Sequence, residues 1–98
     1  MSAYVIVHAI INDPEKMKGY GTPAGPSVKA AGDEVITSGV VAGVLAGSHG
    51  HQRTIILRFA DAYVARRDWC ASNAYQAAIP IREQAMDAVF ILAENPLQ

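Results

Sequence analysis

Two polar side chains interrupt segments that are otherwise apolar and rich in β-branched residues. His8 lies within AYVIVHAII, and Arg58 lies within RTIILRF. An arginine presents a planar, permanently charged group that matches a carboxylate. A nearby cation disfavours a second positive charge, so it keeps an imidazole neutral and able to act as a general base. The pair therefore predicts a site in which Arg58 anchors an anionic oxygen and His8 accepts a proton.

A structural interpretation of the same two residues stays open. Arg58 can pair with an acid such as Glu34, or with an acid of a second copy of the chain, because buried charges are usually paired. His8 would then be a core residue with its hydrogen bonds satisfied. Both interpretations predict a polar cavity, and only the first predicts a ligand.

The remaining histidines form the pattern His49-Gly50-His51, and the chain has one cysteine, Cys70. Two imidazoles in a turn can contribute to a zinc or nickel site, but a stable site needs three or four ligands. No cysteine or carboxylate lies close by in the sequence. We therefore expect solvated loop histidines, no metal site and no cofactor, with Cys70 buried beside Trp69.

The elements that must position these residues follow from hydrophobic patterning. Strands are expected at residues 3–11, 53–59 and 88–93, and residues 34–38 and 40–46 are expected to form one further strand with bulges or a bend. A helix capped by Asp13 is expected to be broken between residues 20 and 28 by glycine and proline. A second helix is expected over residues 61–71, continuing or restarting at 73–78, with a kink or a new start at Pro80.

This order, β-α-β-β-α-β, predicts an α+β, ferredoxin-like fold with a four-stranded antiparallel sheet and both helices on one face. The strands do not alternate between apolar and polar residues, as a sheet with one wet face should. If Phe59 points to the helices, the open face carries Tyr4, Ile6, Ile10, Thr54 and Ile56. A second copy, packed sheet against sheet, is the simplest cover for such a patch, so we predict a homodimer.

Composition excludes several classes of protein. The 98 residues predict a single domain over 1–98, and 51% hydrophobic residues exclude intrinsic disorder. A net charge of −1 argues against a nucleic-acid partner. No apolar run reaches the length of a membrane helix, and the N-terminus lacks the features of a signal peptide, so a cytoplasmic protein is expected.

The order and spacing of several short segments resemble the DUF1330 family over nearly the whole chain. These segments are AYVIV, NDPEK with Tyr20 after it, RTIILRF, and a helix with Trp69, Ser72, Tyr75-Gln76 and Arg82. The resemblance implies a dimeric α/β barrel, in which two sheets form the barrel and each subunit keeps a cleft between sheet and helices. Relatives in that larger group include cofactor-independent monooxygenases, muconolactone-type isomerases and haem enzymes, while the DUF1330 branch has no settled activity.

The sequence departs from the family pattern at positions that bear on a ligand. His8 stands where the family commonly has an acidic residue, and Arg58 stands where it has glutamate. Glu34 and Ser38 replace arginines of the second strand, and Cys70 replaces a tyrosine. The polarity inside the cleft is therefore expected to differ from that of typical members.

Four residues match family positions: Tyr20, Trp69, Tyr75 and Arg82. Aromatic side chains around a pocket can stack on a planar substrate. The alternative is packing between helix and sheet, which the helical spacing of Trp69 favours. Tyr20 lies beside a glycine-rich segment, and such segments often border binding clefts.

The resulting functional hypothesis is a cleft between sheet and helices that binds or converts a small organic molecule, anionic or aromatic. The candidate catalytic residues are His8 and Tyr20, and the candidate ligand-binding residues are Arg58, Ser38, Trp69, Tyr75 and Arg82. Two alternatives stay open: a cofactor-independent monooxygenase or isomerase, and a non-catalytic dimeric module. Whether the chain is an enzyme is left open.

Overall fold

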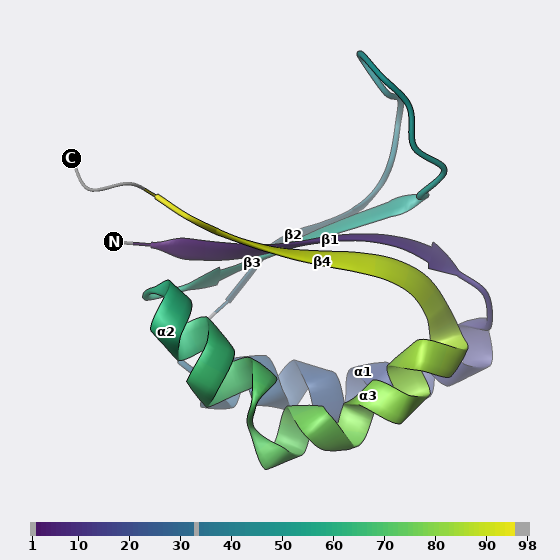
Figure 1. Cartoon of the computed structure of the whole chain (residues 1–98). Coiled ribbons are helices and arrows are strands. Elements are labelled where there is room, and N and C mark those ends of the chain that lie inside the picture. Colours follow the sequence, from purple (N-terminus) through teal and green to yellow (C-terminus); the bar gives the residue numbers. More distant parts are fainter. Residues whose placement is uncertain (1, 33, 96–98) are drawn as a thin grey trace.

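The computed structural model describes residues 2–32 and 34–95 as a curved sheet with helices packed against one of its faces (Figure 1). The elements in order are β1 (Ala3–Ile11), α1 (Pro14–Ala30), β2 (Glu34–Val40), β3 (Arg53–Phe59), α2 (Ala62–Val64), the π-helical segment η1 (Ala65–Cys70), α3 (Asn73–Ala85) and β4 (Met86–Glu94). The sheet order is β2-β3-β1-β4, and all neighbours are antiparallel. The predicted four-stranded β-α-β-β-α-β arrangement is confirmed.

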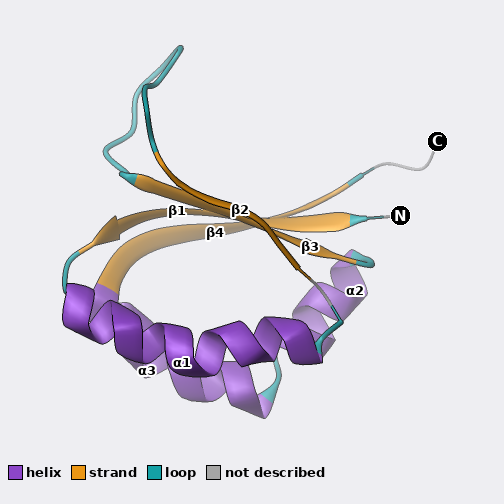
Figure 2. Cartoon of the chain, turned by 180° about the vertical axis from the view of Figure 1, so that it is seen from behind, coloured by secondary structure: helices purple, strands orange, loops and turns teal. Residues whose placement is uncertain are grey.

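Strand β1 divides its side chains strictly between the two faces of the sheet. Ala3, Val5, Val7 and Ala9 are buried against the helices, whereas the residues between them are only partly buried. This alternation follows from the two-residue period of a strand. The face away from the helices (Figure 2), which we call the open face, therefore receives the even-numbered residues of β1, as the burial pattern of the strand indicates.

Helix α1 is continuous from Pro14 to Ala30, so the expected break is wrong. Asp13 caps it by accepting hydrogen bonds from the backbone amides of Glu15 and Lys16. The two internal prolines each remove a backbone donor, which lowers the intrinsic stability of the helix. Packing compensates, because the buried residues at positions 20, 24, 27 and 28 form one stripe at helical spacing against the rest of the molecule.

The second helical region bends before α3 begins. Asp61 caps α2, and the chain continues directly into η1, where the π-helical winding brings Trp69 into the core. Ser72 then caps α3 by accepting a hydrogen bond from the amide of Tyr75. Of the two expected alternatives, a new helix after Ser72 is the one found. Pro80 lies inside α3, so no new helix starts there.

Strand β2 ends at Val40, and residues 41–52 form a loop without strand structure. The expected strand at 40–46 is therefore wrong beyond its first residue. A bulge does occur, between Val35 and Thr37. The loop rises above the open face of the sheet (Figures 1 and 2).

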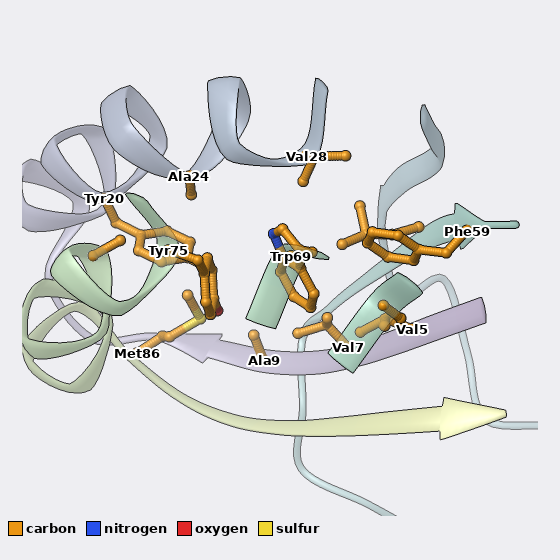
Figure 3. Packing of buried hydrophobic residues seen from close by; sticks show 13 residues of the cluster. Val5, Val7, Ala9, Tyr20, Ala24, Val28, Phe59, Trp69, Tyr75 and Met86 are labelled. Carbon is orange, nitrogen blue, oxygen red and sulfur yellow. The ribbon is translucent and has the colours of Figure 1, made fainter. Parts of the chain in front are cut away.

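The core lies between the helices and the sheet and is centred on aromatic side chains (Figure 3). The ring of Trp69 lies 5.3 Å from that of Phe59 and 4.3 Å from that of Tyr75, measured between ring centroids. Cys70 is exposed, so its expected burial beside Trp69 is wrong. Among the described residues, no helix is long and apolar enough to span a bilayer.

Candidate functional site

Three polar groups form a hydrogen-bond chain between α1 and α3. The Tyr20 and Tyr75 hydroxyls lie 2.8 Å apart, and the Arg82 guanidinium donates through Nη1 to the Tyr75 hydroxyl at 3.0 Å. Both tyrosines are buried. The structure thus brings together three of the residues that the family resemblance singled out.

Tyr20 is held in its protonated form. Burial is the main cause that raises the pKa of Tyr20 above its ordinary value, and the neighbouring Tyr75 adds to it through charge and hydrogen bonding. A neutral phenol near pH 7 can donate or accept a hydrogen bond, but it is not a base. Tyr20, which was predicted as a catalytic candidate, therefore lies where its hydroxyl can orient that of Tyr75 through a hydrogen bond.

A buried hydrogen bond to Ser27 fixes the indole of Trp69. Its indole Nε1 donates to the Ser27 hydroxyl at 3.1 Å, and that hydroxyl donates to the Ala24 carbonyl at 2.6 Å. Ser27 is 2% exposed, so this hydrogen bond lies wholly inside the core. The sequence analysis did not identify Ser27, although its helical spacing from Tyr20 and Ala24 is the signal that could have done so.

Arg82 is a half-buried cation with aromatic rather than acidic neighbours. The centre of its guanidinium lies 4.8 Å from the Phe90 ring centroid and 5.8 Å from that of Tyr75. Among the described residues, the ion pairs are Arg58 with Glu34 and Arg67 with Asp68. Within this part of the chain Arg82 has no carboxylate partner, so its charge is available to a ligand.

These side chains border a pocket of about 240 Å³, which we call the aromatic pocket. It lies between the sheet and the segments η1 and α3. Its lining includes Trp69, Cys70, Tyr75, Arg82 and Phe90, with Arg66 also present and apolar strand residues completing the wall. Sequence analysis missed Phe90, because nothing in AVFILA distinguishes a pocket residue from a core residue.

A second pocket of about 250 Å³ lies on the other side of Trp69 and Phe90, beneath β2 and β3. Tyr20 and Ser38 line it together with apolar residues of α1. No charged side chain is among its lining residues. Ser38 is therefore separated from Arg82 by the aromatic core and belongs to a different, nonpolar cavity.

His8 and Arg58 do not lie in either pocket, because both are on the open face. Their register partners are Thr54 and Tyr4 respectively, so they are four positions apart, about 13 Å along the strands. The His8 Nδ1 atom lies 3.1 Å from the Thr54 hydroxyl. Arg58 forms an ion pair with Glu34, with both side chains about half exposed. His8 and Arg58, which were predicted to act as a pair, are thus separated. Arg58 instead pairs with Glu34, the acid that the structural interpretation named.

Similar solved structures share this fold. A protein of unknown function from Rhodopseudomonas palustris, RPA0582, superposes with a TM-score of 0.76 at 19% identity, covering 99% of this chain and 83% of that one. SnoaB, a cofactor-independent oxygenase from Streptomyces nogalater, superposes with a TM-score of 0.63 at 7% identity, covering 99% of this chain and 95% of SnoaB. A dimeric ferredoxin-like protein of unknown function from Thermobifida fusca superposes with a TM-score of 0.62 at 15% identity, covering 97% of this chain and 92% of that protein.

At these identities the likeness concerns the fold, which is ferredoxin-like. No curated protein matches the sequence. The family model described as a domain of unknown function, DUF1330, matches residues 2–96. The chain, with its four-stranded sheet and helix-covered aromatic core, belongs to the DUF1330 family.

Proposed function

We propose that this chain binds a small organic anion with a planar or aromatic body in the aromatic pocket. The observation that carries the proposal is Arg82, a half-buried guanidinium that borders the pocket and has no carboxylate partner among the described residues. Partial burial of a cation without a charged partner carries a desolvation cost, and an anionic ligand would compensate that cost.

The remaining walls favour the planar part of such a ligand. Trp69, Tyr75 and Phe90 present aromatic surface around the guanidinium, and aromatic rings pack well against planar molecules. The volume of about 240 Å³ is below the usual range for drug-sized ligands, which begins at about 300 Å³. We therefore assign the site to a molecule built on one ring, such as an aromatic carboxylate or a phenolate.

Conversion of the bound molecule is a second candidate function. The cofactor-independent oxygenase SnoaB has a similar fold, and a guanidinium beside the pocket would stabilise an enolate or phenolate oxygen. In this assignment Arg82 replaces Arg58 as the residue that holds the oxygen. Tyr75 and Tyr20 would orient Arg82 through their hydroxyls.

The test compares one substitution on the two faces of the sheet. Binding of benzoate, salicylate and 4-hydroxybenzoate is measured by NMR titration, with benzamide as the neutral analogue. We expect Arg82→Met to weaken binding of the anions at least about tenfold, the effect of one lost charged hydrogen bond, and Arg58→Met to leave it unchanged. Equal binding of benzamide and benzoate, or loss of binding only in Arg58→Met, would refute the assignment to Arg82.

We also propose that two copies pair through the open face. Val89 and Ile91 of β4 are 45% and 47% exposed there, next to partly buried apolar residues of β1. The Thermobifida fusca protein of similar fold is described as dimeric. Pairing of the two open faces would give the dimeric barrel that the family resemblance implies. Failure of every ligand in the titration, together with a stable dimer, would favour a non-catalytic dimeric module.

A further inference from the structure

The three histidines of the chain meet at one end of the open face, although 41 positions separate the first from the second. The ring centroid of His8 lies 5.2 Å from that of His49 and 6.3 Å from that of His51. The His49 and His51 centroids are 5.5 Å apart. We call these three residues the histidine cluster.

Backbone hydrogen bonds hold the loop over His8. The amide of Gln52 donates to the Ala9 carbonyl at 3.0 Å, and the amide of Val41 donates to the Gln52 carbonyl at 2.8 Å. These bonds fix the base of the loop 41–52 next to β1 and β3. His49 and His51 therefore return to the position where β1 presents His8.

The spacing of the rings fits a shared metal ion. When imidazole nitrogens bind zinc tetrahedrally at about 2.0–2.1 Å, the ring centres lie about 5 Å from one another. Two of the three observed separations, 5.2 and 5.5 Å, are within about half an ångström of that value, and the third, 6.3 Å, is about 1.3 Å longer. A small movement of the loop would close this difference.

The hydrogen bond to Thr54 prepares His8 for this role. The His8 Nδ1 atom lies 3.1 Å from the Thr54 hydroxyl, and in the tautomer whose Nδ1 donates to that hydroxyl the lone pair of Nε2 is free to bind a metal. Metal-binding histidines commonly have their second nitrogen fixed in this way. Thr54 lies directly opposite His8 in the β1–β3 register.

The two loop histidines must turn to complete the site. As the side chains lie, no group of three or more histidine, cysteine, aspartate or glutamate residues in the described part of the chain is placed to hold a metal ion. The Nδ1 atom of His49 accepts a hydrogen bond from the amide of His51 at 3.1 Å. His49 is exposed and lies in a segment without helix or strand, so water can replace this bond when the ring rotates.

We propose that His8, His49 and His51 together bind one divalent first-row transition-metal ion per chain. Three neutral imidazoles suit Zn²⁺, Co²⁺, Ni²⁺ and Cu²⁺, whereas Mg²⁺ and Ca²⁺ prefer oxygen ligands. Water would take the remaining coordination position. The cluster lies on the opposite face of the sheet from the aromatic pocket, so this proposal does not depend on the ligand proposed for that pocket.

Zinc binding tests the proposal directly. The protein is prepared without a polyhistidine tag and titrated with Zn²⁺ by calorimetry, and then with Co²⁺, whose visible spectrum reports the coordination. The variants are His8→Gln, His49→Gln and His51→Gln. The control is Cys70→Ser, because Cys70 is exposed and a cysteine thiolate also binds Zn²⁺. Circular dichroism confirms that each variant is folded.

We expect one Zn²⁺ per chain and a loss of affinity in each histidine variant, with Cys70→Ser unchanged. Loss of even an indirect partner of a metal ligand typically costs about 10- to 100-fold in affinity, so loss of a ligand should cost at least as much. Thr54→Val should weaken binding and leave the Co²⁺ spectrum the same in shape. Absence of zinc binding, or zinc affinity unchanged in His8→Gln, would overturn the three-histidine site.

Discussion

The hydroxyl groups of Tyr20 and Tyr75 meet 2.8 Å apart between two helices that come from opposite halves of the chain. Their rings are nearly perpendicular, at 77°, an edge-to-face arrangement that is favourable for aromatic pairs. Arg82 donates to the same Tyr75 oxygen. One polar chain thus links α1 to α3 and ends at the border of the aromatic pocket.

Alkaline pH should destabilise the protein through Tyr20. Because burial raises the pKa of Tyr20 in the folded state, the unfolded chain loses the phenolic proton first, above about pH 10. The unfolded state then binds fewer protons than the folded state, so the free energy of unfolding falls as pH rises, by up to about 1.4 kcal/mol per pH unit.

Denaturant unfolding of wild type and Tyr20→Phe between neutral and alkaline pH checks this dependence. The slope above about pH 10 should be smaller in Tyr20→Phe. Tyr63→Phe is the control for removal of an exposed tyrosine hydroxyl, because Tyr63 is 61% exposed. Identical slopes for wild type and Tyr20→Phe would contradict the assigned pKa shift.

Ser27→Ala should lower the free energy of unfolding by about 1–3 kcal/mol. The substitution leaves the buried indole N–H of Trp69 without its acceptor, and an unsatisfied buried donor carries a desolvation cost of that size. Ser38→Ala is the matched control, because Ser38 is exposed; its effect should stay within about 0.5 kcal/mol. Equal effects of the two substitutions would show that the Trp69 hydrogen bond contributes little.

Arg58→Met should change the stability of the isolated chain by less than about 1 kcal/mol. The Arg58 and Glu34 side chains are 48% and 55% exposed, and solvent screens such pairs strongly. Chemical denaturation at low and high salt measures the effect, and Glu34→Gln should behave in the same way. A loss of several kcal/mol in either variant would instead indicate that the pair is desolvated in the assembled protein.

Val89→Lys should convert the proposed dimer to monomer. The new ammonium group would lie on the apolar open face, where pairing of two sheets would bury it unpaired. Light scattering coupled to size-exclusion chromatography measures the mass in solution. Val35→Lys is the control, since Val35 is 53% exposed but lines the second pocket on the helix side. A monomeric wild type, or a dimeric Val89→Lys, would contradict pairing through this face.

The order of the elements was predictable because each strand carries a strong local signal. Residues 3–11 are almost entirely apolar or β-branched and end at Asn12-Asp13-Pro14, so both ends of β1 agree with expectation. The continuity of α1 was not predictable from local propensity. Pro23 and Pro26 disfavour a helix locally, and only the buried stripe beginning at Tyr20 shows why packing overrides them.

The candidate site was predictable in its residue types but not in its grouping. Tyr20, Tyr75 and Arg82 come together as one group, because two helices pack side by side. His8 and Arg58 were both identified as unusual, yet the strand period alone assigns His8 to the same face as Tyr4 and Ile6, away from the helices. That the loop returns His49 to His8 depends on the path of residues 41–52, for which the sequence holds no periodic signal.

The alternation of β1 lets one strand serve two surfaces that can diversify separately. Changes at its even positions alter the histidine cluster and the surface available to another subunit, whereas changes at odd positions alter the hydrophobic interior. Among related chains, metal affinity or assembly could therefore be gained or lost while the ligand pocket stays the same. Libraries of variants that change only the even-numbered or only the odd-numbered positions of β1 would separate these traits within this nine-residue strand.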